Sequence, residues 1–299
     1  MPDDCCSASQ RALDYQLLLA MKVQMLSFYV AWGQGSGQPD RAGIEEVVRK
    51  GFVPMITWEP WQLPAVARPE NQPDFSLSAI VSGKYDDYIR RWAVGLKDIK
   101  GRIFFRPMHE MNGNWYPWCG SVNGNTPEAF VEAWRHIRSI FRKAGSDRLA
   151  WVWSPYAHSV PDEPQNEIAR YFPGVEDVDW VGLDGYNWGT SQPWSRWQSF
   201  EDIFYDGYER LTHVAPGKSC MIAEAGCAED GGSKGAWIKE AFEALRGRFT
   251  RIKAMVWFNI DKECDWRIES SQESLASFRT CAGHWQAIAN RTERSKNEA

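Results

Sequence analysis

The stretch that decides the fold is RIFFRPMHEMNGNWYPW, residues 102–118, an apolar segment that runs directly into polar and aromatic side chains. Short apolar runs of this kind are typical of fully buried strands, so Glu110 lies where such a strand ends. A second run, CMIAEAG at 220–226, puts Glu224 in the same position. Parallel α/β barrels build their active sites at the carboxyl ends of the strands. We therefore expect the two carboxylates to meet at a barrel mouth.

Strand and helix patterns alternate along the whole chain. Strands are expected at residues 25–32, 53–58, 102–108, 149–155, 179–184, 220–224 and 253–259. Alternation this regular favours a parallel sheet and an α/β fold of the (β/α)8 TIM-barrel type. No linker interrupts the pattern, so we predict one domain over residues 1–299, with irregular tails at 1–10 and 286–299.

Helix boundaries are marked by capping residues. Thr126 followed by Pro127 predicts one helix start, and capping-box-like pairs predict two more, Ser199 with Asp202 and Ser270 with Glu273. The expected helix stops are Gly145, Gly247 and Gly283.

Composition argues against several classes of partner. The 34 basic and 39 acidic residues nearly balance, so nothing indicates binding to nucleic acid or to an anionic membrane. No apolar run approaches a membrane span, and no signal peptide is evident, so the chain as it stands is expected to be cytoplasmic. We also expect a monomer.

Seven cysteines without zinc spacing indicate free thiols; a disulfide between two of Cys119, Cys227 and Cys264 is the alternative.

Paired carboxylates among 17 tryptophans indicate carbohydrate chemistry. Two carboxyl groups are the catalytic equipment of most glycoside hydrolases, and indoles stack on the C–H faces of sugars. A metal hydrolase is disfavoured because no H-x-H pair occurs, and no phosphate-binding loop follows a strand. We therefore expect no metal and no cofactor. The competing class is a non-catalytic carbohydrate-binding barrel, which would tolerate the loss of one carboxylate.

Four motifs, RPMHEMNGNWYPW, VDWVGLDGYNWG, MIAEAG and MVWFNIDKECDWR, give the chain a resemblance to glycoside hydrolase family 26 over roughly residues 12–283. The resemblance implies a secreted, retaining endo-β-glycanase that degrades plant polysaccharide. By motif position Glu110 would be the acid/base and Glu224 the nucleophile, with carboxyl groups ~5–5.5 Å apart. Asp184 and Tyr186 would support the nucleophile, and His109 would contact the sugar or the nucleophile. Arg106 is interpreted as an ion-pair partner that keeps the nucleophile charged.

Tryptophans beyond strand ends are interpreted as sugar platforms, and those within strands as core. The resemblance implies that Trp257 lies beneath the reacting sugar and that Trp115 flanks the acid. The other expected substrate contacts are Trp118, Trp188, Glu59 and Trp61. Trp194 and Trp197 are interpreted as loop packing. The family default is a β-1,4-mannan; the loop WYPWC resembles the β-1,3-1,4-glucanase members and favours a lichenan-type glucan as the alternative.

The resemblance also exposes a missing element. The family's acid ends the fourth strand, whereas Glu110 ends only the third strand that the pattern contains. Residues 11–23 indicate the helix after strand one, and residues 1–10 lack the apolar content of a buried strand. We therefore expect a degenerate or missing first strand. A start site placed too late would explain it and would also have removed a secretion signal.

Overall fold

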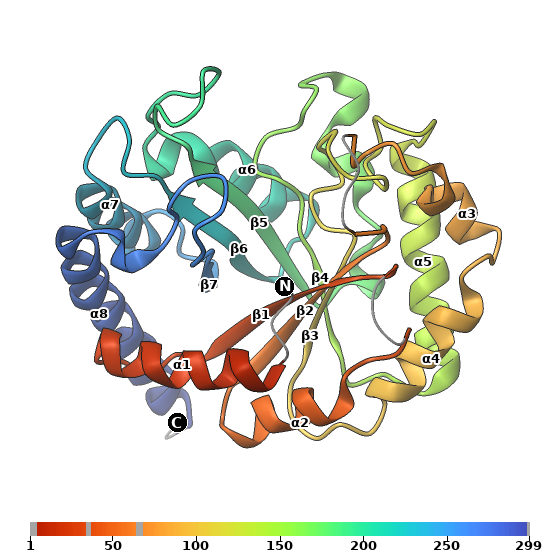
Figure 1. Ribbon diagram of the computed structural model, residues 1–299, viewed down its shortest axis with the longest axis horizontal. Coiled ribbons are helices and arrows are strands. Elements are labelled where there is room, and N and C mark those ends of the chain that lie inside the picture. The colour runs from red at the N-terminus through yellow and green to blue at the C-terminus, as the bar shows by residue number, and fades with distance from the viewer. Residues whose placement is uncertain (1–4, 34–36, 64–67, 298–299) are drawn as a thin grey trace.

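The computed structural model describes residues 5–33, 37–63 and 68–297. Its centre is one seven-stranded sheet in which every strand is parallel to its neighbours and the spatial order equals the chain order (Figure 1). The strands are β1 Met25–Ala31, β2 Val53–Glu59, β3 Phe104–Pro107, β4 Ala150–Trp153, β5 Trp180–Asn187, β6 Ser219–Cys227 and β7 Ile252–Trp257. All seven strands expected from the sequence are therefore confirmed.

Helices cover the outside of the curled sheet (Figure 1). They are α1 Cys5–Leu19, α2 Arg41–Arg49, α3 Leu77–Val81, α4 Asp86–Leu96, α5 Pro127–Ala144, α6 Phe200–Val214, α7 Lys234–Gly247 and α8 Gln272–Asn297, with short 3₁₀ turns at Pro73–Phe75, Pro164–Asn166, Ile168–Tyr171, Val175–Asp177 and Ile268–Ser270. This alternation is the architecture of a (β/α) barrel.

The predicted helix boundaries are mostly confirmed. Thr126 caps α5, Ser199 and Asp202 form a reciprocal capping box on α6, and Gly145 ends α5 in the left-handed conformation. Two boundaries were wrong. The hydroxyl of Ser271 rather than Ser270 accepts from the first turn of α8, and Gly283 lies inside that helix. The irregular tails expected at 1–10 and 286–299 were wrong for the described residues, because α1 begins at residue 5 and α8 runs to residue 297; residues 1–4 and 298–299 lie outside the described part.

A seam separates β1 from β7. In the described part of the chain neither of these edge strands has a partner on its outer side, and residues 5–10, where strand one was sought, are helical. The expectation of an absent first strand therefore holds for the described residues. Helix α1 lies beside α8 at the seam (Figure 1). Arg279 donates to the Leu18 carbonyl at 2.6 Å, and Tyr15 donates to Glu269.

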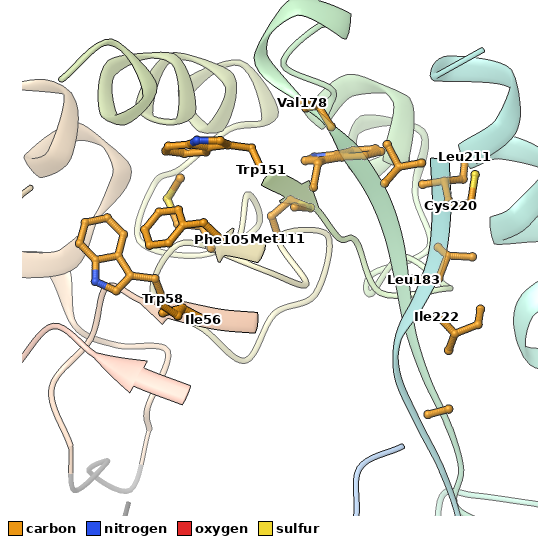
Figure 2. Close-up of a cluster of buried hydrophobic side chains, with 14 of the residues drawn as sticks. Ile56, Trp58, Phe105, Met111, Trp151, Val178, Leu183, Leu211, Cys220 and Ile222 are labelled. Carbon is orange, nitrogen blue, oxygen red and sulfur yellow. The ribbon is translucent and has the colours of Figure 1, made fainter. Parts of the chain in front are cut away.

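The strands bury apolar side chains on both faces, as a covered parallel sheet must. The outer face packs against the helices through large aromatic rings; Phe105 lies 5.2 Å from Trp58 and 5.0 Å from Trp151, measured between ring centroids (Figure 2). The inner face is filled at one level by a small apolar cluster: Met55, Phe104, Val152, Met221 and Ala223. Two residues further along β2, β3 and β4, the inward side chains are the polar Thr57, Arg106 and Ser154. These polar side chains form the level of the barrel interior at which the site lies.

Cysteines and membrane spans can be assessed for the described residues. Cys119, Cys220, Cys227, Cys264 and Cys281 are free thiols there, as expected. None of the helices described here has the length and apolar content that a membrane crossing requires.

Candidate active site

Glu224 lies within strand β6 at a break in its pairing with β5. Leu183 pairs with Ile222 but the next residue, Asp184, pairs with Glu224, so β6 carries one extra residue, Ala223. Such a bulge interrupts the alternation of side chains and re-aims its neighbours. Ala223 joins the inner apolar cluster, and Glu224 also contacts the inward-facing Arg106. The bulge therefore lets two consecutive residues face the barrel interior.

Arg106 is the centre of the polar level. It projects from β3, is fully buried, and donates to Asp184 at 2.8 Å and to Glu224. Its Nε and Nη2 atoms donate to the hydroxyl of Thr57 on β2, at 3.0 and 2.7 Å. The other carboxylate oxygen of Asp184 accepts a hydrogen bond from the Ser154 hydroxyl at 2.8 Å. A planar guanidinium with several fixed donors suits this task, because it can serve two carboxylates at once.

The surroundings of Glu224 keep it ionised. Burial by itself would raise the pKa of this carboxyl, but the Arg106 charge and the Tyr186 hydroxyl, which donates to the second carboxylate oxygen, lower the pKa of Glu224 to about 2. Arg106 and Tyr186 thus both contact Glu224: one supplies the opposing charge and the other a hydrogen bond to the charged form.

Glu110 follows β3 in a tight turn. Met108 and Glu110 both have positive φ values, 51° and 52°, a conformation that non-glycine residues adopt rarely and that costs energy. The turn is fixed by the Glu110 amide, which donates to the Ser154 carbonyl at 2.8 Å, and the Trp115 indole donates to the carboxylate at 2.7 Å. Strained backbone thus aims this carboxyl into the barrel mouth.

The surroundings of Glu110 keep it protonated. Burial is the largest cause, and the nearby charges of Asp184 and Glu224 act in the same direction, so the pKa of Glu110 is raised well above its ordinary value. Trp115 and Arg106 oppose this effect only in part. Two carboxyl groups in one site are thereby held in opposite protonation states.

His109 stands between Glu59 and Glu224. Its Nε2 atom lies 4.0 Å from a Glu59 oxygen and 3.9 Å from a Glu224 oxygen, both beyond hydrogen-bond distance. Burial and the Arg106 charge lower the pKa of His109 to about 3, so the ring is neutral. Burial and Glu224 raise the pKa of Glu59 to about 8, and Trp61 donates to it at 3.2 Å. These neutral polar groups suit sugar hydroxyls.

One trio has the composition of a metal site. A ring nitrogen of His109 and carboxylate oxygens of Glu110 and Asp184 all lie within 4.8 Å of one another. However, both oxygens of Asp184 already accept hydrogen bonds, from Arg106 and Ser154. The neighbouring guanidinium would also repel a cation, so the donor set does not fit a metal ion.

The predicted aromatic contacts divide into two groups. Trp61, Trp115 and Trp188 lie at the mouth, partly exposed. Trp118 is fully buried and donates to the His109 carbonyl at 2.7 Å, so it supports the turn from below. The structure directs Trp257 away from the site: its ring packs on Trp237 of α7 and Phe278 of α8.

The alternation of a strand explains the position of Trp257. Ala254 and Val256 face the inner cluster, so Met255 and Trp257 face the helices. The next residue, Phe258, faces inward: its ring centroid lies 5.6 Å from that of Tyr186 and 6.1 Å from that of Tyr29. Sequence reasoning did not single out several site residues: Tyr29, Thr57, Tyr116, Ser154, Tyr156, Phe258 and Trp266. Tyr29 and Thr57 could have been found, because they share the inward phase of Arg106 and are paired in register.

A parallel barrel sheet with one ionised and one protonated carboxyl at its mouth defines the glycoside hydrolase class. Residues 68–240, more than half of the chain, match the profile of glycosyl hydrolase family 26. The chain belongs to this family.

Relatives and solved structures agree with this assignment. The chain is 37% identical over 272 residues to Endoglucanase H of Acetivibrio thermocellus, covering 90% of this chain and 28% of that protein. It is 30% identical over 167 residues to a mannan endo-1,4-beta-mannosidase of Bacillus subtilis, covering 52% of this chain and 40% of that protein. The solved structure of Bacillus subtilis mannanase man26 superposes with a TM-score of 0.62 at 18% identity, over 90% of this chain and 79% of that one.

Proposed function

We propose that this chain is a retaining endo-β-glycoside hydrolase that cleaves a β-1,4-linked polysaccharide by double displacement. The observation that carries the proposal is the pair of buried glutamates at the barrel mouth. Glu224 accepts from the Arg106 guanidinium and the Tyr186 hydroxyl, which lowers its pKa, whereas Glu110 accepts from a neutral indole and burial raises its pKa. A non-catalytic carbohydrate-binding barrel would have no use for this difference. Endo action is supported by the similarity to Endoglucanase H and to a mannan endo-1,4-beta-mannosidase.

In the first displacement, a carboxylate oxygen of Glu224 attacks the anomeric carbon while Glu110 gives its proton to the leaving glycosidic oxygen. Arg106 and Tyr186 hold the attacking group in place and keep it charged. The product of this step is a covalent glycosyl-enzyme, and the leaving sugar chain departs as an alcohol.

In the second displacement Glu110 acts as a base. The ester formed on Glu224 carries no negative charge, so one of the effects that raise the pKa of Glu110 disappears. Glu110 can then take a proton from water, which attacks the anomeric carbon and releases the sugar with its original configuration. The coupling between the two carboxyls therefore switches Glu110 from acid to base.

For the substrate, a β-glucan with β-1,4 linkages is the first candidate and β-mannan the second. The similarity to Endoglucanase H extends over 90% of this chain, whereas the similarity to the Bacillus subtilis mannosidase extends over 52%. The loop WYPWC after the acid points the same way. Glucan and mannan differ in the configuration of one hydroxyl group. A few polar contacts at the barrel mouth would distinguish the two sugars.

A substrate panel tests the proposal. Release of reducing sugar from lichenan, carboxymethylcellulose, mannan and xylan should be fastest on a glucan. Proton NMR of the first product should show the β-anomer. An initial α-anomer would overturn the role of Glu224, and preference for mannan would reverse the order of the two substrates.

A further inference from the structure

The loop between β5 and α6, residues 188–198, is closed by one buried side chain. The Asn187 amide oxygen accepts from the Gly189 amide at 3.1 Å and from the Gln198 amide at 3.1 Å, so it joins both ends of the loop. Inside the loop the Ser195 hydroxyl donates to the Gly189 carbonyl at 2.8 Å. The loop therefore has a fixed shape of its own.

A second anchor comes from the next loop of the barrel. The Thr190 amide donates to the Asp230 carbonyl at 3.0 Å. The ring of Trp197 covers Gly232, where an added Cβ atom would lie 2.5 Å from the indole. Trp197 is thus a packing residue, as the sequence analysis expected.

Trp194 behaves differently from Trp197. It is 71% exposed, and it is the single aromatic residue among the large hydrophobic side chains that are exposed in the described part of the chain. Burying a large apolar side chain stabilises a protein by about 1.5–3 kcal/mol. Because Trp194 is mostly exposed, its ring contributes little of this stabilisation. A single exposed apolar residue is common on a protein surface, so the significance of Trp194 depends on the rings beside it.

An aromatic surface links Trp194 to the nucleophile. Its ring lies 5.2 Å from that of Trp188, and Trp188 lies 4.8 Å from Trp266 and 6.3 Å from Tyr186, measured between centroids. Tyr186 donates to Glu224. The exposed ring is therefore continuous with the catalytic centre, two ring contacts from the residue that orients the nucleophile.

We propose that Trp194 binds a pyranose ring of the substrate chain at a distal subsite, beyond the sugar that reacts. This inference rests on the proposed function. The C–H face of a β-linked pyranose is flat and apolar and matches an indole face, and a polysaccharide chain that lies on Glu224 extends along the same surface. Binding energy at this subsite would favour long chains over short ones.

Trp194→Ala tests the subsite, with Trp194→Phe as the conservative variant. Leu17→Ala is the matched control, since Leu17 is an exposed apolar residue on α1. For Trp194→Ala we expect kcat/KM on the polysaccharide to fall about tenfold, the value of roughly one buried apolar contact. An aryl glycoside with one or two sugars should change far less. Trp194→Phe should recover most of the loss, and the control should match the wild type.

Calorimetric titration with a β-1,4-linked hexasaccharide on the Glu110→Gln protein separates this subsite from the proposed function. Adding Trp194→Ala should weaken binding about tenfold. Wild-type rates and affinity for Trp194→Ala, with an unchanged Tm, would overturn the subsite while hydrolysis stands. A protein that binds the hexasaccharide through Trp194 but cleaves no β-glycan would retain the subsite and overturn the proposed function.

Discussion

The two glutamates proposed as catalytic occupy different kinds of backbone. Glu224 lies in the middle of a long strand, at a bulge, with donors from Arg106 and Tyr186. Glu110 lies beyond the end of a four-residue strand, in a left-handed turn, with one neutral donor, Trp115. Both are almost completely buried. The same side chain in equally dry surroundings thus acquires opposite protonation states.

The comparison shows that burial alone does not decide the charge of a carboxyl. Desolvation is the largest cause acting on both residues and raises both pKa values. The difference comes from the single positive charge of Arg106, which contacts Glu224 directly and serves Asp184 with its other arm. Glu110 has no ion pair with Arg106, whose charge opposes the rise in its pKa only in part, and it keeps its proton.

The largest expected effect is the loss of the ionised partner. Glu224→Ala should lower kcat on the order of 10⁴–10⁶-fold on every substrate, because no covalent intermediate can form. Steady-state assays on a polysaccharide and on an activated aryl glycoside measure this. Glu243→Ala, an exposed glutamate on α7, is the control. Substantial turnover by Glu224→Ala on either substrate would contradict the assignment.

Glu110→Ala should have a smaller and more selective effect. General acid catalysis contributes about 10²–10⁴-fold, so cleavage of a polysaccharide should fall by that factor. An aryl glycoside with a good leaving group needs no proton, so its first displacement should be nearly preserved and a burst of aryl alcohol should appear. Equal losses on both substrates would show that Glu110 is not the acid.

Tyr186→Phe should shift the acidic limb of the pH–activity profile toward higher pH. It removes a donor to the charged form of Glu224, so the pKa of Glu224 rises from about 2 and activity is lost earlier on acidification. A hydrogen bond to a charged group is worth about 1.5–3 kcal/mol, which corresponds to a loss of about 10–100-fold in kcat/KM. Trp115→Phe is the control, because its donor serves Glu110 instead. If the acidic limb shifts equally in Tyr186→Phe and Trp115→Phe, then Tyr186 does not act selectively on Glu224.

The sheet was predictable because its signals are local. Buried parallel strands form uninterrupted apolar runs, and all seven runs became strands. The helix stop at Gly283 failed because glycine is tolerated inside a helix, and nothing lies within 4 Å of the position that its Cβ would occupy. The N-cap of α8 was predicted at Ser270 and is Ser271 in the structure. An error of one residue is usual for an element boundary.

The site was predictable only where a motif named the residue. Glu110, Glu224, Arg106 and Tyr186 were assigned from short strings around strand ends. The direction of Trp257 was missed, because the phase of a strand depends on which residues reach the inner cluster, and bulges change that phase. The bulge at Ala223 shows the same difficulty, since no local signal in CMIAE announces an extra residue.

The smallest expected effect concerns Glu59, a third buried glutamate of the site that, like Glu110, lacks a direct ion pair with Arg106. Burial and the Glu224 charge raise the pKa of Glu59 from an ordinary value of 4.5 to about 8. Between these two values the folded protein holds a proton that the unfolded chain releases, so this group's contribution to stability is present below pH 4.5 and is lost as pH rises to about 8. The unfolding free energy should therefore decline over that range.

Glu59→Gln imitates the protonated carboxyl and cannot release a proton. Its stability advantage over the wild type should grow as pH rises and level off above about pH 8, reaching on the order of a few kcal/mol. Urea unfolding at a series of pH values measures the difference, and Glu243→Gln on the exposed face of α7 should show no such trend. Parallel stability curves for wild type and Glu59→Gln would mean that Glu59 is ionised in the folded protein. Negative charge at the mouth would then be shared among Glu59, Asp184 and Glu224.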